Sequence, residues 1–170
     1  MPYKPQETIY AFDFDGVICD SAVETSITGW KAAQSIWTDM SALPSTLPSQ
    51  QLINDFRKIR PLLETGYEAI LIMRLLHLGK QVTELCESYE PLINELVQQE
   101  ALQTDYLKKL FGETRDRWIV ENEQEWLTMN PLFPNVMEKL HTLTDSSWYI
   151  ITTKQERFVK LILQANKIHI

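Results

Sequence analysis

The sequence predicts an α/β protein in which a small parallel sheet forms the core and a long all-helical segment is inserted into it. The segments "TIYAFDF" (8–14) and "SWYIITT" (147–153) are rich in β-branched and aromatic residues, which is typical of buried strands. A long, mostly helical stretch separates them. Because a parallel crossover needs only about a dozen residues, the surplus is long enough to form a separate helical lobe.

The first strand ends at a pair of aspartates, Asp13 and Asp15. Gly16 follows them and suits a sharp exit from the strand that exposes backbone N–H groups. A helix is predicted next, over 21–37. It has Ser21 as a possible N-cap and an acidic residue three positions later, which is a capping-box pattern.

The long middle stretch has the spacing of helices. Apolar residues recur at helical intervals over 52–63, after a Pro/Ser loop. The run "GYEAILIMRLLHLG" (66–79) is a strongly apolar helix with Gly79 in the place of a C-terminal stop. Two more helices are expected over 83–102 and 104–127.

The last part returns to the core. Two prolines in "NPLFPNV" mark a turn, a short helix is expected over 136–143, and a final helix follows the second strand. We therefore expect an α/β core from 1–16 and 132–170, and a helical domain over 17–131.

Composition narrows the function. The formal charge is −7, from 16 basic and 23 acidic side chains, so we expect neither nucleic-acid nor membrane binding, since both favour a basic face. The N-terminus has no apolar signal segment, and Cys19 and Cys86 do not form a CxxC pair. We expect a cytoplasmic protein with reduced thiols.

The aspartates stand where an α/β protein binds its ligands. Ligands of open parallel sheets lie beyond the carboxyl ends of the strands, and Asp13, Asp15, Thr152 and Thr153 all fall there. Paired carboxylates suit Mg²⁺, which prefers oxygen ligands. One carboxylate is also suited to attack phosphorus while the other handles the proton of the leaving group.

At these residues the chain resembles a known family. "DFDGVICDS" (13–21) resembles the first motif of the haloacid dehalogenase superfamily, and "YIITTK" (149–154) resembles its second. "PLFPNVMEKLHTL" (131–143) resembles the segment that re-enters the core from the cap, with Asn135 in place of the usual Gly. The resemblance implies a Rossmann-like parallel sheet, incomplete in this chain, with an inserted all-α cap domain.

The resemblance also implies roles for the site residues. Asp13 would be the nucleophile that forms an aspartyl-phosphate, and Thr152 would hydrogen-bond the phosphoryl group. Asp15 would protonate the leaving oxygen and then activate water, and Mg²⁺ would be held by Asp13 and Asp15. An aspartate at the position of Asp15 favours a phosphatase over a dehalogenase, with a phosphomutase as an alternative.

Other residues are candidates for contact with substrate, which the resemblance indicates to be a small phosphorylated metabolite. Near the core these are Gly16, Thr153 and Lys154; in the helical domain they are Arg60 and Arg74. For each arginine the alternative is a solvated helix face. Lys154 is the candidate to replace a lysine of the family that steadies the nucleophile.

Two elements of the family pattern, that lysine and an acidic pair after a later strand, do not occur before Ile170. The sequence is therefore either a piece of a longer phosphatase or a natural short form that has lost catalysis and serves as a binding or interaction module. A sheet with few strands also leaves an unpaired edge, which favours a homodimer.

Overall fold

The computed structural model describes residues 9–143 and 147–168, and these divide into two compact units. The sheet unit comprises the residues up to Ser21 and those from Asn130 onward; the helical unit is Ala22–Met129. Among the described residues, no helix has both the length and the apolar character needed to cross a membrane.

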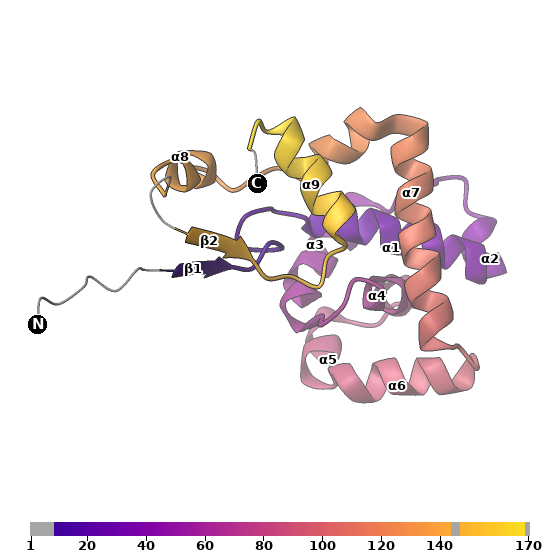
Figure 1. The fold of residues 1–170 in the computed structure, drawn as a ribbon. Coiled ribbons are helices and arrows are strands. Elements are labelled where there is room, and N and C mark those ends of the chain that lie inside the picture. Colours follow the sequence, from indigo (N-terminus) through magenta and orange to yellow (C-terminus); the bar gives the residue numbers. More distant parts are fainter. Residues whose placement is uncertain (1–8, 144–146, 169–170) are drawn as a thin grey trace, which may run out of the picture. The chain divides into compact units, whose positions relative to one another are not determined.

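The sheet unit contains one two-stranded parallel sheet. Its elements are β1 (Ile9–Phe12), α8 (Val136–His141), β2 (Ser147–Ile150) and α9 (Glu156–Ala165). The strands lie side by side, with Ile9 opposite Ser147 and Phe12 opposite Ile150 (Figure 1). α9 is amphipathic and buries Phe158 among its apolar side chains.

The prediction of a Rossmann-like sheet core is wrong for this structure, which is mostly helical and pairs only two strands within the described residues. That fold repeats the strand–helix unit several times, whereas this sequence carries the strand pattern in two segments only. The further strands were an extrapolation from the family motifs. The parallel pairing of the two predicted segments is present.

The turn before α8 needs an unusual backbone conformation. Asn135 precedes the helix with φ of 67° and ψ of 0°, in the left-handed region. Gly and Asn adopt this region most readily. The local geometry therefore suits the Asn found at this position.

The helical unit is all α. Its elements are α1 (Ala22–Ile36), α2 (Thr38–Ser41), α3 (Gln50–Ile59), the 3₁₀ turn η1 (Arg60–Leu62), α4 (Glu68–His77), α5 (Val82–Glu87), α6 (Tyr89–Gln99) and α7 (Thr104–Thr128). The large all-helical segment expected from the sequence is thus present.

α4 is the central helix of this unit. Every residue from Ala69 to Leu76 is buried, because the segment is apolar on nearly all sides. The helix ends at His77, and Gly79, the predicted stop, follows two residues later with a φ of +87°. The N–H of Gly79 bonds the carbonyl of Leu76 and the N–H of Lys80 bonds that of Leu75, which is a Schellman motif.

α1 packs more extensively on α4 than on any other helix, and Gly29 makes this close approach possible. A Cβ at position 29 would lie 2.6 Å from the carbonyl oxygen of Ala69 and 2.9 Å from its Cβ. Real Cβ contacts are longer, so a larger residue would push the two helices apart.

We therefore expect Gly29→Ala to destabilise the chain by about 1–3 kcal/mol, although Ala is the better helix former by about 1 kcal/mol. Urea unfolding followed by circular dichroism measures the change. Ser35→Ala, at an exposed position of the same helix, is the control and should change stability little. A Gly29→Ala variant as stable as the parent would contradict the close approach.

A buried carboxylate joins α1 to α7. Glu24 is fully buried and accepts hydrogen bonds from Arg115 Nε at 2.7 Å and Nη2 at 2.6 Å. It also accepts from Trp126 Nε1 at 3.1 Å and from Thr28 Oγ1 at 2.6 Å. Four donors and an opposite charge compensate for the removal of this carboxylate from water.

α7 is kinked, and residues on both sides of the kink donate hydrogen bonds to Glu24. Asn122 leaves the helical conformation, with φ of −159° and ψ of 80°. Its Oδ1 accepts the N–H of Glu125 at 3.1 Å, so Asn122 caps a second, short helix. Arg115 lies before the kink and Trp126 after it, and both donate to Glu24.

We expect Glu24→Ala to lower the free energy of unfolding by about 3–5 kcal/mol, because it leaves the Arg115 guanidinium buried without its carboxylate. The double variant Glu24→Met/Arg115→Met removes both charges and should recover most of that loss. Urea unfolding compares the two variants. If the double variant were as unstable as Glu24→Ala, the unpaired charge of Arg115 would not be the cause of the lost stability.

Candidate functional site at the ends of the two strands

The parallel register places the ends of both strands at one edge of the sheet. Phe12 pairs with Ile150, and the N–H of Ile151 donates to the carbonyl of Phe12 at 2.8 Å. The loop after β1 and the loop after β2 therefore start side by side. Asp13 and Asp15 lie in the first loop, and Thr152 to Lys154 lie in the second.

The loop after β1 is closed by its own backbone. The carbonyl of Phe14 accepts the N–H groups of Ile18 and Cys19, both at 2.9 Å, and Gly16 donates to the carbonyl of Cys19 at 2.8 Å. Gly16 has a φ of +81°, which is the conformational freedom expected of it. Phe14, Ile18 and Cys19 are buried, so the loop is anchored and not merely a solvated link.

The two aspartates of the loop differ in environment. Asp13 is exposed, and its Oδ1 accepts the N–H of Phe14 at 2.6 Å. Asp15 is half-buried, and its Oδ1 accepts from Ser21 Oγ at 2.5 Å and from Lys154 Nζ at 3.1 Å. Of the pair, Asp15 thus has the cation beside it.

Lys154 is the residue that joins the two loops. Its side chain is only 1% exposed, and it forms a salt bridge with Asp15 across a separation of 139 residues in the chain. The ammonium also lies 5.9 Å from the ring centroid of Phe14. Its backbone N–H donates to Thr152 Oγ1 at 3.1 Å, which holds the hydroxyl of Thr152 in the same loop.

The structure therefore brings together Asp15, Thr152 and Lys154, with Asp13 two residues from Asp15 at the same strand end. Thr153 lies in the same loop and is exposed. Ser21 was missed as a member of this cluster, because its position before α1 suggested only an N-cap. Its proximity to Asp15 depends on the turn between them, which the sequence pattern does not reveal.

The two arginines proposed as substrate contacts lie in the helical unit. Arg74 is buried and its Nη1 donates to Asp39 Oδ2 at 2.5 Å, while His77 Nε2 lies 3.5 Å from the same oxygen. The hydrogen bond from Arg74 holds the pKa of the Asp39 carboxyl below its ordinary value. Arg60 is half-buried in η1. Arg74 thus has a structural partner between α4 and α2.

The strand ends offer one exposed carboxylate, that of Asp13, to a hard divalent cation. Mg²⁺ is usually held by one or two carboxylates and completes its shell with water and phosphate oxygens. Asp13 is exposed and fits this requirement. The ammonium of Lys154 competes with a cation for Asp15, and no cluster of three or more His, Cys, Asp or Glu suited to a metal occurs among the described residues.

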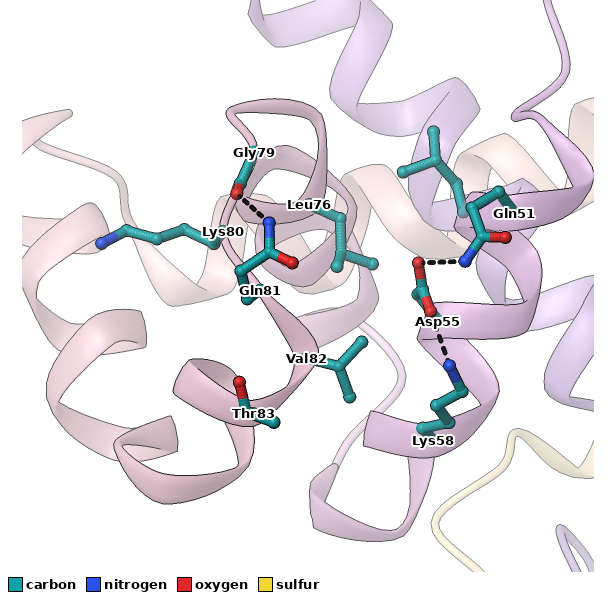
Figure 2. A pocket seen from close by; sticks show the side chains of 10 residues that line it. Gln51, Asp55, Lys58, Leu76, Gly79, Lys80, Gln81, Val82 and Thr83 are labelled. Carbon is teal, nitrogen blue, oxygen red and sulfur yellow. Dashed lines mark hydrogen bonds and ion pairs between the residues drawn. The ribbon is translucent and has the colours of Figure 1, made fainter.

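A pocket of about 320 Å³ lies in the helical unit between α3 and the start of α5. Figure 2 shows that its acidic residue is already satisfied: Asp55 accepts from Gln51 Nε2 at 2.8 Å and from Lys58 Nζ at 2.9 Å. The bonds from Lys58 and Gln51 keep the pKa of Asp55 below its ordinary value. Gln81 Nε2 donates to the carbonyl of Gly79. Several polar side chains of this pocket therefore already have hydrogen-bond partners within the protein.

Searches of protein-family models, curated proteins and solved structures find nothing that matches this chain. The likeness to the haloacid dehalogenase superfamily therefore rests on the motif residues themselves.

The salt bridge between Asp15 and Lys154 can be measured by a double-mutant cycle. We expect Asp15→Asn and Lys154→Met to be coupled by about 1–3 kcal/mol, because the ammonium is buried against the carboxylate. Unfolding free energies of the two single variants and the double variant give the coupling.

The matched control is the pair Glu156 and Lys160 on α9, whose charged atoms lie 2.6 Å apart but whose side chains are exposed. Its coupling should be much smaller, because solvent screens it. Equal couplings would contradict the view that burial makes the first pair special.

Proposed function

We propose that this chain belongs to a Mg²⁺-dependent phosphate-ester hydrolase that acts on small phosphorylated metabolites through an aspartyl-phosphate on Asp13. The observation that carries the proposal is the convergence of both strand ends. The parallel pairing of β1 with β2 and the salt bridge of Lys154 with Asp15 bring two distant motifs to one edge.

The environment of Asp13 suits a nucleophile. It is exposed, and the N–H of Phe14 fixes one of its oxygens at 2.6 Å. Oδ2 makes no hydrogen bond with the described residues, so it is the atom that attacks phosphorus. A carboxylate oriented in this way loses less freedom when the substrate binds.

Lys154 addresses the charge problem of such a site. Two aspartates and a phosphoryl group bring several negative charges to one place, and these repel one another. The ammonium of Lys154 compensates for Asp15. The phosphoryl group therefore meets one unpaired carboxylate, that of Asp13, instead of two.

The reaction has two steps in this proposal. In the first, Asp15 takes up a proton from solvent as the substrate binds, Asp13 Oδ2 forms a bond to phosphorus, the bond from phosphorus to the leaving oxygen breaks, and Asp15 passes its proton to that oxygen. In the second, water attacks the phosphorus of the aspartyl-phosphate, Asp15 takes the proton, and Asp13 is released with inorganic phosphate. Thr152 donates its hydroxyl to a phosphoryl oxygen.

Mg²⁺, when bound by Asp13 and the backbone carbonyl of Asp15, supplies positive charge to the phosphoryl oxygens. Lys154 and Ser21 hold the Asp15 carboxylate in one orientation throughout, since both donate to its Oδ1. They are positioning residues in this scheme.

The test uses two esters with different leaving groups, p-nitrophenyl phosphate and glycerol 3-phosphate, with Mg²⁺. Asp13→Asn should reduce the release of phosphate from both esters to the rate without protein. Asp15→Asn should slow hydrolysis of the alkyl ester by about 10²- to 10⁴-fold. It should slow the aryl ester far less, because p-nitrophenolate leaves without a proton. Phosphate release rates are compared for each variant.

Asp20→Asn is the control, since Asp20 is a half-buried carboxyl in the same loop with no role in the proposed reaction. Activity that survives Asp13→Asn would overturn the proposal. Binding of phosphate that depends on Lys154, with no turnover of either ester, would favour a non-catalytic binding module instead.

A further inference from the structure

A second pocket of the helical unit has a different chemistry from the one in Figure 2. It has a volume of about 270 Å³, and Lys31, Arg117, Trp118 and Glu121 line it together with Gln34 and Thr46. Lys31 belongs to α1, and the other three charged or aromatic residues belong to α7. The pocket thus lies where the first helix of the unit meets the kinked one.

The wall of this pocket is held rigidly. The ammonium of Lys31 lies 4.0 Å from the ring centroid of Trp118, a cation–π distance. The indole is buried, and its Nε1 donates to Glu125 Oε2 at 2.7 Å. Since Asn122 caps the helical turn that carries Glu125, the kink in α7 fixes the orientation of the ring.

The two cations that line the pocket, Lys31 and Arg117, have few carboxylates near them to balance their charge. Burial lowers the pKa of Lys31, and the carboxylates of Glu125 and Glu121 act in the opposite direction. Glu125 is already bonded to the indole of Trp118. The guanidinium of Arg117 forms no hydrogen bond or ion pair with any residue that the structure describes, which leaves one carboxylate, Glu121, among the lining residues to face two cations.

We infer that this pocket binds a small organic oxyanion, a phosphate or a carboxylate, between Lys31 and Arg117. Such a group would give Arg117 a charge partner and would stabilise the ammonium of Lys31 in its partly buried place. The volume lies near the lower end for small-molecule sites, about 300 Å³, so the ligand is a few heavy atoms larger than the anion itself. The site is independent of Asp13 and Asp15, and its failure leaves the proposed function untouched.

The experiment is titration calorimetry on the full 170-residue chain in EDTA, with inorganic pyrophosphate and succinate as the two probes. The wild-type chain should bind at least one probe saturably, and the tighter one identifies the class of oxyanion. Lys31→Met and Arg117→Gln should each weaken that binding, on the order of tenfold for Lys31. Glu121→Gln should tighten it about two- to fivefold, because it removes a nearby like charge.

Lys109→Met is the matched control, because Lys109 lies on the same helix, is largely exposed and faces Glu113 at 3.7 Å. It should leave the affinity unchanged. The inference is overturned if neither probe binds, if Lys31→Met and Arg117→Gln bind as tightly as the wild type, or if Glu121→Gln weakens binding. Arg117 and Glu121 are exposed, so the test remains valid even where Lys31→Met fails to fold.

Discussion

The sheet unit depends on one ion pair, that of Lys154 with Asp15. An ammonium whose side chain is 1% exposed has lost nearly all its water, and only an opposite charge within hydrogen-bond reach makes this tolerable. The partner comes from the loop after the other strand. A parallel sheet of two short strands has few backbone hydrogen bonds of its own. The ion pair, the hydroxyl of Ser21 and the buried Phe14 therefore hold the loop after β1 in the position in which the aspartates are presented.

The helical unit also contains a buried ion pair, but here the fully buried group is an anion instead of a cation. Glu24 is a fully buried anion, and Arg115 supplies two of its hydrogen bonds. In both units a buried charge pairs with an opposite charge far away in the sequence. Such a charge penalises alternative packings, because any arrangement that separates the pair leaves an ion without compensation. The apolar core of α4 supplies most of the burial, and the ion pair selects how α7 docks on α1.

The sequence predicted the local features well and the tertiary ones poorly. The positions of both strands and the C-terminal stop of α4 near Gly79 follow from side-chain pattern and backbone preference. The expected burial of the strands is wrong, because Ile9, Tyr10 and Tyr149 are exposed. The kink at Asn122 was not predicted, because the apolar and polar spacing of the segment does not change there. The ion pair of Arg74 with Asp39 was not predicted either, since nothing local shows that Asp39, 35 residues earlier, is its partner. The Rossmann-like core was wrong because it was inferred from motifs and not from strands present in the chain.

Two aspartates one residue apart at the end of a strand repel each other, and the structure separates their roles by environment. Phe14, which lies between the two aspartates, is fully buried, whereas Asp13 is exposed and Asp15 is half-buried. The turn that begins at Gly16 then brings Ser21 to Asp15, and β2 brings Lys154. Within the part of the chain that the structure describes, Asp13 accepts only the backbone N–H of Phe14. One carboxylate is thereby fixed and compensated, whereas the other remains exposed with its charge available. A strand end that only needed solubility would have no reason to bury a lysine against one member of the pair, and this asymmetry is the feature that supports the roles proposed for Asp13 and Asp15.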